Sequence, residues 1–219
     1  MDEPLWRGSS LTERSSERRR QLLEAALDLL GSGGGRAITV RSVCRDSGLS
    51  PKYFYESFAD RDQLVGALYD SVVAELAGAA ADAASADPAE SADQSDVPAV
   101  LAAVFLAAAE FLRADRRRAR IVFTEPLVDD ALRGRARETL PRLVSTLAPV
   151  VGIGIDATDP GRGPLAMAAL GGSLLLTFVT WLEGGTGMDE QGLAEFCVDV
   201  VLSTPGVLVI DQASPRCGD

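Results

Sequence analysis

Residues 39–58 constrain the fold of this chain more than any other stretch. Thr39 stands where a helix can begin, because its hydroxyl can accept a hydrogen bond from a backbone N–H of the first turn. Val40, Val43 and Cys44 then recur at helical spacing, which indicates one buried face. The polar side chains between them are expected to face water: Arg41, Ser42 and Arg45. A short amphipathic helix therefore opens the stretch.

A second short helix follows a tight turn. Gly48 supplies the left-handed conformation that a sharp turn requires. Ser50 is the expected cap of the next helix, and Pro51 fits its first position, where a missing N–H leaves no bond unmade. Phe54 and Phe58 give this helix an apolar face. Two short helices joined in this way form a helix-turn-helix.

The outer end of the second helix carries Lys52, Tyr53 and Tyr55. In a helix-turn-helix, the N-terminal end of the second helix approaches the base edges of DNA. Lysine and tyrosine side chains donate hydrogen bonds to phosphates and bases. The motif therefore predicts a DNA-binding surface.

Longer helices are predicted on both sides of the motif. Residues 16–30 repeat leucine and alanine at helical spacing, and residues 61–84 are predicted to form a long helix. The motif is thus expected to belong to a compact helical domain that continues into a larger one.

Residues 18–69 resemble the N-terminal domain of the TetR family of bacterial repressors. The resemblance rests on short motifs in a fixed order: Leu22-Leu23-Glu24-Ala25-Ala26, Thr39-Val40-Arg41, Ser47-Gly48-Leu49-Ser50, Phe54-Tyr55-x-x-Phe58 and Arg61-Asp62-x-Leu64. The ordered combination is specific, whereas no single element of it is. The resemblance covers about a quarter of the chain.

The resemblance implies an all-α fold, with an N-terminal three-helix helix-turn-helix DNA-binding domain and a larger C-terminal helical domain for ligand binding and dimerisation. We expect a mobile N-terminal arm at residues 1–14 and the DNA-binding domain at 15–66. The effector-binding and dimerisation domain is expected at 67–204, followed by a poorly structured tail at 205–219.

The resemblance also implies roles for single residues. Thr39 and Tyr55 would contact phosphates, Arg41 and Arg61 would lie near the DNA backbone, and Lys52 and Tyr53 would read bases. The full set of expected DNA contacts is Thr39, Arg41, Ser50, Pro51, Lys52, Tyr53, Tyr55 and Arg61. Two positions depart from the family pattern, because Ser57 stands where His is frequent and Lys52 where Gly is common. Lys52 reaches either a guanine edge or a phosphate.

The charge of the chain is unevenly distributed. The 219 residues carry a formal charge of −11, which argues at first against a nucleic-acid binder. Residues 7–61, however, hold ten Lys and Arg against seven Asp and Glu, whereas residues 62–219 carry a charge of −12. The basic character is confined to the predicted DNA-binding domain, and the acidic remainder would repel DNA and help to orient the protein on it.

The acidic part is predicted to be helical as well, at residues 99–114, 116–125, 130–151, 165–182 and 189–202. The basic run 116–120 is either a second nucleic-acid patch or a solvated face that pairs with nearby carboxylates. We favour the second interpretation because the run has no interleaved aromatics.

Residues 165–182 carry no charge and are the only candidate membrane span, but their Gly, Ser and Thr content favours a buried helix. In proteins of the TetR family, the last two helices form the homodimer interface.

By the same resemblance, an effector pocket would lie in the C-terminal domain. Its candidate lining residues are Phe105, Phe111, Phe123, Met167, Phe178 and Trp181. The alternative for each is ordinary core packing, which helical spacing predicts with or without a cavity.

An enzyme is the main alternative from another class. The chain has no histidine, which removes histidine-activated nucleophiles and most metal sites. Its three cysteines are odd in number and scattered, as is typical of a reducing cytoplasm. We therefore expect a cytoplasmic protein with no catalytic residue, no metal ion and no cofactor.

The function predicted from the sequence is a ligand-responsive DNA-binding transcriptional regulator. It would be a homodimeric repressor that binds double-stranded, pseudo-palindromic operator DNA and is released by a small apolar or amphipathic effector, without a membrane partner. Two alternatives stay open: a helix-turn-helix protein that has lost DNA binding and serves as an interaction module, and, less favoured, an enzyme in the C-terminal domain.

Overall fold

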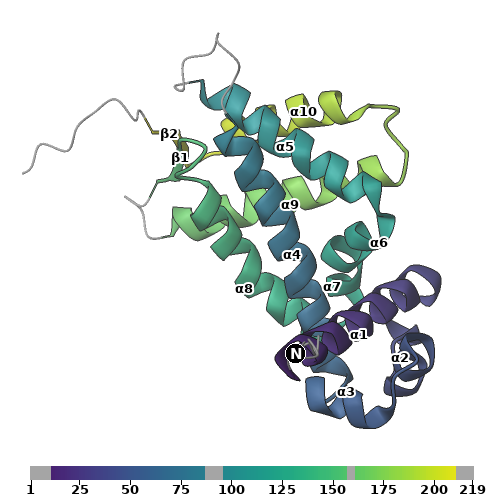
Figure 1. Ribbon diagram of the computed structural model, residues 1–219. Helices are drawn as coiled ribbons and strands as arrows, with labels where there is room; N and C mark the ends of the chain where they lie inside the picture. The colour runs from purple at the N-terminus through teal and green to yellow at the C-terminus, as the bar shows by residue number, and fades with distance from the viewer. Residues whose placement is uncertain (1–10, 87–95, 157–160, 211–219) are drawn as a thin grey trace, which may run out of the picture. The chain divides into compact units, whose positions relative to one another are not determined.

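The computed structural model describes residues 11–86, 96–156 and 161–210. These residues form helices and one pair of short strands (Figure 1). The chain divides into two compact units, with the boundary between Ser71 and Val72. We call residues 1–71 the first unit and residues 72–219 the second unit.

The first unit is helical throughout its described residues. Its elements are α1 (Leu11–Gly33), the 3₁₀ helix η1 (Gly35–Ala37), α2 (Val40–Ser47), α3 (Pro51–Ser57) and the first part of α4 (Arg61–Ser85). Residues 11–14, which the sequence analysis assigns to a mobile arm, belong to the first turn of α1. The rest of that arm lies outside the described residues.

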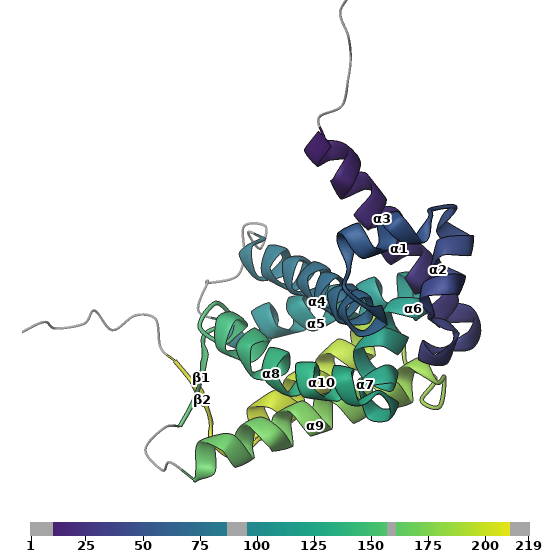
Figure 2. The ribbon, with the colours of Figure 1, turned by 90° about the horizontal axis from the view of Figure 1, so that it is seen from below.

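The core of the first unit lies where α1, α2 and α3 pack together (Figure 2). Its largest fully buried side chains are Leu22, Leu30, Ile38, Val43, Phe54, Phe58, Leu64 and Tyr69. The burial of Phe54 and Phe58 confirms the apolar face predicted for the second helix of the motif. Burying a large side chain of this kind stabilises a fold by about 1.5–3 kcal/mol.

The second unit begins within α4 and contains the remaining elements. They are α5 (Val97–Ala114), α6 (Arg116–Ala119), the π-helix η2 (Arg120–Thr124), α7 (Glu125–Val128), α8 (Asp130–Leu147), β1 (Ile153–Ile155), α9 (Arg162–Leu182), α10 (Glu190–Ser203) and β2 (Val207–Val209). Helix α5 packs against α10 (Figure 1). Aliphatic side chains fill the core, among them Leu101, Val104, Leu170, Val198 and Val201.

The strands β1 and β2 pair antiparallel, with Ile153 opposite Val209 and Ile155 opposite Val207 (Figure 2). The expectation of a poorly structured tail from residue 205 is therefore wrong as far as Ile210, and the later residues lie outside the described part of the chain. Each strand has three residues, too few for an alternating pattern to stand out in the sequence. The pairing satisfies backbone groups that a free chain end would leave to water.

Three helices of the described residues, α4, α5 and α9, are long and apolar enough to cross a membrane by length and composition. The prediction that residues 165–182, within α9, are the only candidate membrane span is therefore wrong. In α9, one face is buried through Leu170, Phe178 and Trp181, while Leu165 and Leu176 are exposed. The helix is thus packed on one side only.

Candidate DNA-binding surface

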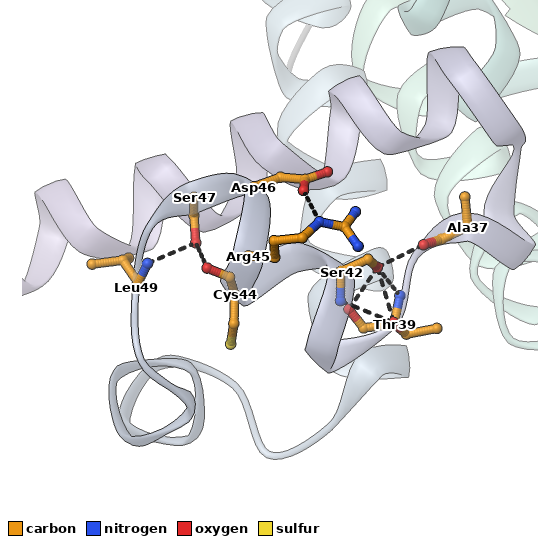
Figure 3. Close-up of polar contacts among 8 residues, drawn as sticks. All are labelled: Ala37, Thr39, Ser42, Cys44, Arg45, Asp46, Ser47 and Leu49. Carbon is orange, nitrogen blue, oxygen red and sulfur yellow. Dashed lines mark hydrogen bonds and ion pairs between the residues drawn. The ribbon is translucent and has the colours of Figure 1, made fainter.

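Helix α2 begins with a complete capping box. Thr39 Oγ1 accepts a hydrogen bond from the Ser42 backbone N–H at 3.1 Å, and Ser42 Oγ accepts one from the Thr39 N–H at 2.9 Å (Figure 3). Ser42 Oγ also donates to the Ala37 carbonyl at 2.7 Å. The capping role predicted for Thr39 is confirmed, but Ser42 is buried and does not face water as the sequence analysis expects. Its hydroxyl anchors the start of α2 to the preceding turn.

The turn between α2 and α3 is built around Gly48. This residue has φ 69° and ψ 11°, the left-handed conformation that the sequence predicts. Ser47 Oγ accepts from the Leu49 N–H and donates to the Cys44 carbonyl, both at 3.4 Å (Figure 3). Burial raises the pKa of the Cys44 thiol, so this cysteine is packed as a protonated, inert side chain.

Helix α3 starts with Pro51 at its first position, as predicted. Ser50 occupies the capping position in an extended backbone conformation, yet its side chain makes no capping hydrogen bond. The Ser50 hydroxyl is exposed and has no protein partner among the described residues. It therefore remains available to an outside acceptor or donor.

Three polar side chains extend outwards from α3. The Lys52 side chain is 79% exposed, Tyr55 is 60% exposed and Tyr53 is 36% exposed. Thr39 and Arg41 are also exposed at the start of α2. Seven of the eight predicted contact residues are thus exposed at the start of α2, at the start of α3 or along α3. They are Thr39, Arg41, Ser50, Pro51, Lys52, Tyr53 and Tyr55. The eighth predicted contact is Arg61.

Two arginines of α1 hold α3 in place. The Arg18 guanidinium lies 4.6 Å from the centroid of the Tyr53 ring, and the Arg19 guanidinium lies 4.3 Å from that of Phe58. Arg19 Nη1 also donates to the carbonyl of Ser57 at 3.1 Å, at the end of α3 where backbone acceptors lack helical partners. Each cation–π contact stabilises by about 0.5–1 kcal/mol at an exposed site.

Glu56 places a carboxylate among the cations of the exposed face. It lies 3.9 Å from Lys52 Nζ and 3.8 Å from Arg18 Nη2. These pairs are exposed and individually weak, about 0–1 kcal/mol each. The two ion pairs act mainly on side-chain position, because they hold the Lys52 ammonium and the Arg18 guanidinium close to the Glu56 carboxylate. The sequence analysis assigns no role to Glu56, Arg18 or Arg19.

Arg61 is used inside the first unit. Its Nη2 donates to the carbonyl of Gly35 at 3.1 Å, and its Nε donates to that of Ile38 at 3.4 Å. Its Nη1 pairs with Asp62 at 2.7 Å. These bonds join the start of α4 to the turn that precedes α2.

No protein-family model matches the chain, and no curated protein matches it. Solved structures do. FadR of Bacillus halodurans, a fatty acid degradation regulator, is 16% identical, with 85% of this chain and 95% of that chain covered and a TM-score of 0.64. A TetR-like transcriptional regulator from Rhodococcus sp. RHA1 is 18% identical, with 84% and 92% covered and a TM-score of 0.60. FadR of Bacillus subtilis, solved in complex with stearoyl-CoA, is 17% identical, with 84% and 98% covered and a TM-score of 0.62. The fold is that of the TetR-family regulators.

The TetR-family fold confirms the all-α class and the helix-turn-helix predicted from the sequence. The match extends well beyond residues 18–69, the part in which the sequence motifs lie, because it covers more than four-fifths of the chain. The helices after α4 therefore match the TetR-family fold in structure, although the sequence motifs of the resemblance do not extend to them.

The six predicted effector-pocket residues have different surroundings in the second unit. Phe123 and Phe178 stack with ring centroids 5.8 Å apart, Phe105 packs against the core of the second unit, and Phe111 lies under the guanidinium of Arg118. Met167 is half-buried on α9. Trp181 lines a pocket between the α5–α6 junction and the loop that follows α9. Core packing, the alternative considered for each residue, accounts for Phe105, Phe123 and Phe178.

Three of the four arginines in the basic run 116–120 pair with carboxylates, as favoured from the sequence. Arg117 bonds to Asp115 at 2.7 Å and lowers the pKa of that carboxyl. Arg120 lies 2.9 Å from Glu125, whose side chain is only 5% exposed. The pairing leaves the run poorly suited to a second nucleic-acid patch.

Proposed function

We propose that the protein is a transcriptional regulator that binds double-stranded DNA through α3. The observation that carries this proposal is the outward face of α3, where Lys52, Tyr53 and Tyr55 are exposed on a TetR-family fold. Buried aromatics and the arginines of α1 hold the face rigidly. Preorganised side chains bind at a lower entropic cost than flexible ones.

Each predicted contact receives a role in this proposal. Lys52 and Tyr53 read base edges, and Tyr55 donates to a phosphate. The exposed residues at the two helix starts lie against the DNA backbone: Thr39, Arg41, Ser50 and Pro51. Arg61 supports the entry to α2 instead, because backbone carbonyls and Asp62 occupy its guanidinium.

The proposed assembly is a homodimer through α9 and α10. On α9, exposed apolar or small residues recur every three or four positions at Leu165, Ala168, Gly172 and Leu176. On α10, Phe196 is 47% exposed. Exposed apolar stripes of this kind mark protein interfaces, and small residues let a second helix approach closely. A twofold dimer would present two α3 helices to the half-sites of a pseudo-palindromic operator.

We further propose that the regulator is a repressor released by a small molecule bound in the second unit. Helix α4 belongs to both units and is the element that would carry the signal. The switch works only if the effector binds two arrangements of the dimer with different affinity. The complex of FadR of Bacillus subtilis with stearoyl-CoA supports the proposal that a regulator with this fold binds a small molecule.

Two alternatives compete with this proposal. An interaction module with a helix-turn-helix fold would not need Lys52, Tyr53 and Tyr55 on one exposed face. An enzyme is disfavoured because the chain has no histidine and its structural neighbours are regulators. The cytoplasm is the proposed location, since a regulator of this kind acts on cellular DNA.

The test is selection of bound fragments from a genomic DNA pool by the purified protein at near-physiological salt. We expect enrichment of an inverted repeat, and loss of that enrichment in a variant with Lys52→Ala and Tyr55→Phe. A folded, dimeric protein that enriches no sequence, with or without cell extract metabolites, would favour the interaction module.

A further inference from the structure

A pocket of about 200 Å³ lies in the second unit, between the α5–α6 junction and the loop that joins α9 to α10. Arg113 and Arg116 line it from the junction, and Trp181 and Met188 line it from the end of α9 and the loop. No Asp or Glu is among its described lining residues. The pocket is therefore positively charged within an otherwise acidic unit.

Arg116 differs from the arginines around it. The neighbouring arginines pair with carboxylates: Arg113 with Glu190, Arg117 with Asp115, Arg118 with Glu75 and Arg120 with Glu125. Arg116 has no carboxylate partner among the residues that the structure describes. Its planar fork of N–H donors is free to bind an anion from solution.

Trp181 supplies a flat apolar wall. The residue is 7% exposed, and its Nε1–H donates to the carbonyl of Met188 at 2.9 Å. This bond holds the indole against the loop and uses its only polar group. A ligand in the pocket therefore meets the carbon surface of the ring. Gly184 and Gly187 have φ of 82° and 65°, which lets the loop fold back over the end of α9.

We propose that this pocket binds a small aromatic carboxylate, with its carboxylate on Arg116 and its ring against Trp181. A guanidinium matches a carboxylate with two parallel hydrogen bonds, so Arg116 selects for that group. The volume suits a molecule the size of benzoate, since pockets for drug-sized ligands span about 300–1,000 Å³. The inference rests on the proposed function only in naming this anion as the effector; the binding itself requires no DNA.

The test uses the full chain with Trp6→Phe, which leaves Trp181 as the one tryptophan. Titration with benzoate in the absence of DNA should give a saturable change in tryptophan fluorescence. Arg116→Ala should weaken binding by about tenfold or more, because it removes the charge-assisted pair. Arg137→Ala is the matched control: Arg137 is exposed on α8, away from the pocket lining, and its loss should leave the affinity unchanged.

Two further probes separate the parts of the ligand. Benzamide has the same shape without the charge and should bind about tenfold more weakly or worse. Inorganic phosphate has the charge without the ring and should also bind more weakly than benzoate. The proposal is overturned by absence of saturable benzoate binding, by equal binding of benzamide or phosphate, or by an Arg116→Ala variant that binds like its parent.

Operator selection distinguishes this inference from the proposed function. An enriched inverted repeat without benzoate binding would overturn the pocket proposal alone. Benzoate binding without any enriched DNA would support the pocket and count against the regulator.

Discussion

Lys52 is the single cation of α3, and its ammonium lies 3.9 Å from Glu56. We expect Lys52→Ala to relax the preference at one base pair in each half-site, by about 1–3 kcal/mol, if the ammonium reads a guanine edge. The measurement is the affinity of the variant for operators with each base substituted in turn.

Tyr55→Phe is the comparison for that experiment. It removes a hydroxyl assigned to a phosphate, so it should weaken binding to every operator alike. A uniform loss in Lys52→Ala as well would assign Lys52 to the DNA backbone rather than to a base.

Glu56 opposes DNA binding by its charge, because it lies beside Lys52 and Arg18 and would approach the phosphates with them. We expect Glu56→Gln to raise the affinity for non-specific DNA and to steepen the salt dependence by about one unit in the log–log slope, since a released cation can now pair with a phosphate. The measurement is affinity for random duplex DNA at several salt concentrations. An unchanged slope would show that neither cation is held back by Glu56.

Tyr69 is fully buried in the first unit, and its hydroxyl has no hydrogen-bond partner among the described residues. An unmade bond of this kind costs about 1–3 kcal/mol. We expect Tyr69→Phe to raise the free energy of unfolding by about 1 kcal/mol, because it removes the unpaired group and keeps the ring. Denaturant unfolding at neutral pH measures the change, and a loss of stability would reveal a partner for the hydroxyl.

The same tyrosine predicts a pH effect. Burial, together with the charge of Asp70, raises the pKa of Tyr69 from 10.0 to about 12. The folded state therefore holds this proton at pH values where the unfolded chain has released it, so stability falls as pH rises from about 10 to about 12. Tyr69→Phe should remove this part of the alkaline loss. Cys197, whose pKa burial also raises to about 12, is present in both proteins and cancels in the comparison.

Among the elements, the start of α2 offers the clearest test of local stability. Ser42 Oγ makes bonds with Thr39 and Ala37 while buried. We expect Ser42→Ala to lower the free energy of unfolding by about 1–2 kcal/mol, since it breaks the capping box and removes the Ser42 partner of the Thr39 N–H and of the Ala37 carbonyl.

Ser50→Ala is the control, because Ser50 is a serine at the start of α3, in the N-cap position, whose side chain makes no capping bond. Its effect on stability should stay within about 0.5 kcal/mol. Equal losses in the two variants would mean that the capping box contributes nothing beyond helix propensity.

The elements that the sequence predicts well are those with local signals. The bounds of α2 and α3 follow from Thr39, Gly48 and Pro51, each of which acts on its own turn of chain. The roles of Arg18 and Arg19 do not follow in this way, because Arg19 bonds to a carbonyl 38 positions away. Periodicity predicts that a helix exists, but not which distant group its polar face will meet.

Ser42 and the effector-pocket residues show the same limit. The helical spacing of the apolar residues around Ser42 predicts that this serine faces solvent. Its burial follows instead from its hydrogen bonds with Thr39, as the third residue of the capping box. The spacing of aromatic residues such as Phe123 and Phe178 in the sequence is the same whether their rings surround a ligand or, as here, stack on each other. The pocket beside Trp181 depends on Arg116, and the sequence alone does not show that this arginine has no carboxylate partner among the described residues.

For the whole molecule, the exposed stripe of α9 predicts the oligomeric state. Leu176 is 63% exposed in the middle of this stripe. We expect Leu176→Glu to convert the proposed dimer to a monomer, because it would place a charge from each subunit in the proposed apolar interface. Sedimentation equilibrium measures the mass, and Leu127→Glu is the control because Leu127 is 59% exposed on α7, outside both proposed interface helices. A Leu176→Glu protein that remains dimeric would exclude this face as the interface.

The order in which the two units can be completed during synthesis follows from where their closing contacts lie in the chain. The contacts of α3 with Arg18 and Arg19 of α1 are made by residues that leave the ribosome before residue 72. The second unit has to wait for Val209, since β1 has no partner strand until β2 has been made. N-terminal domains generally fold first during translation. A nascent chain of this protein therefore possesses α3, the proposed DNA-binding helix, well before it possesses a finished second unit, so the proposed capacity to bind DNA arises before the proposed capacity to respond to an effector.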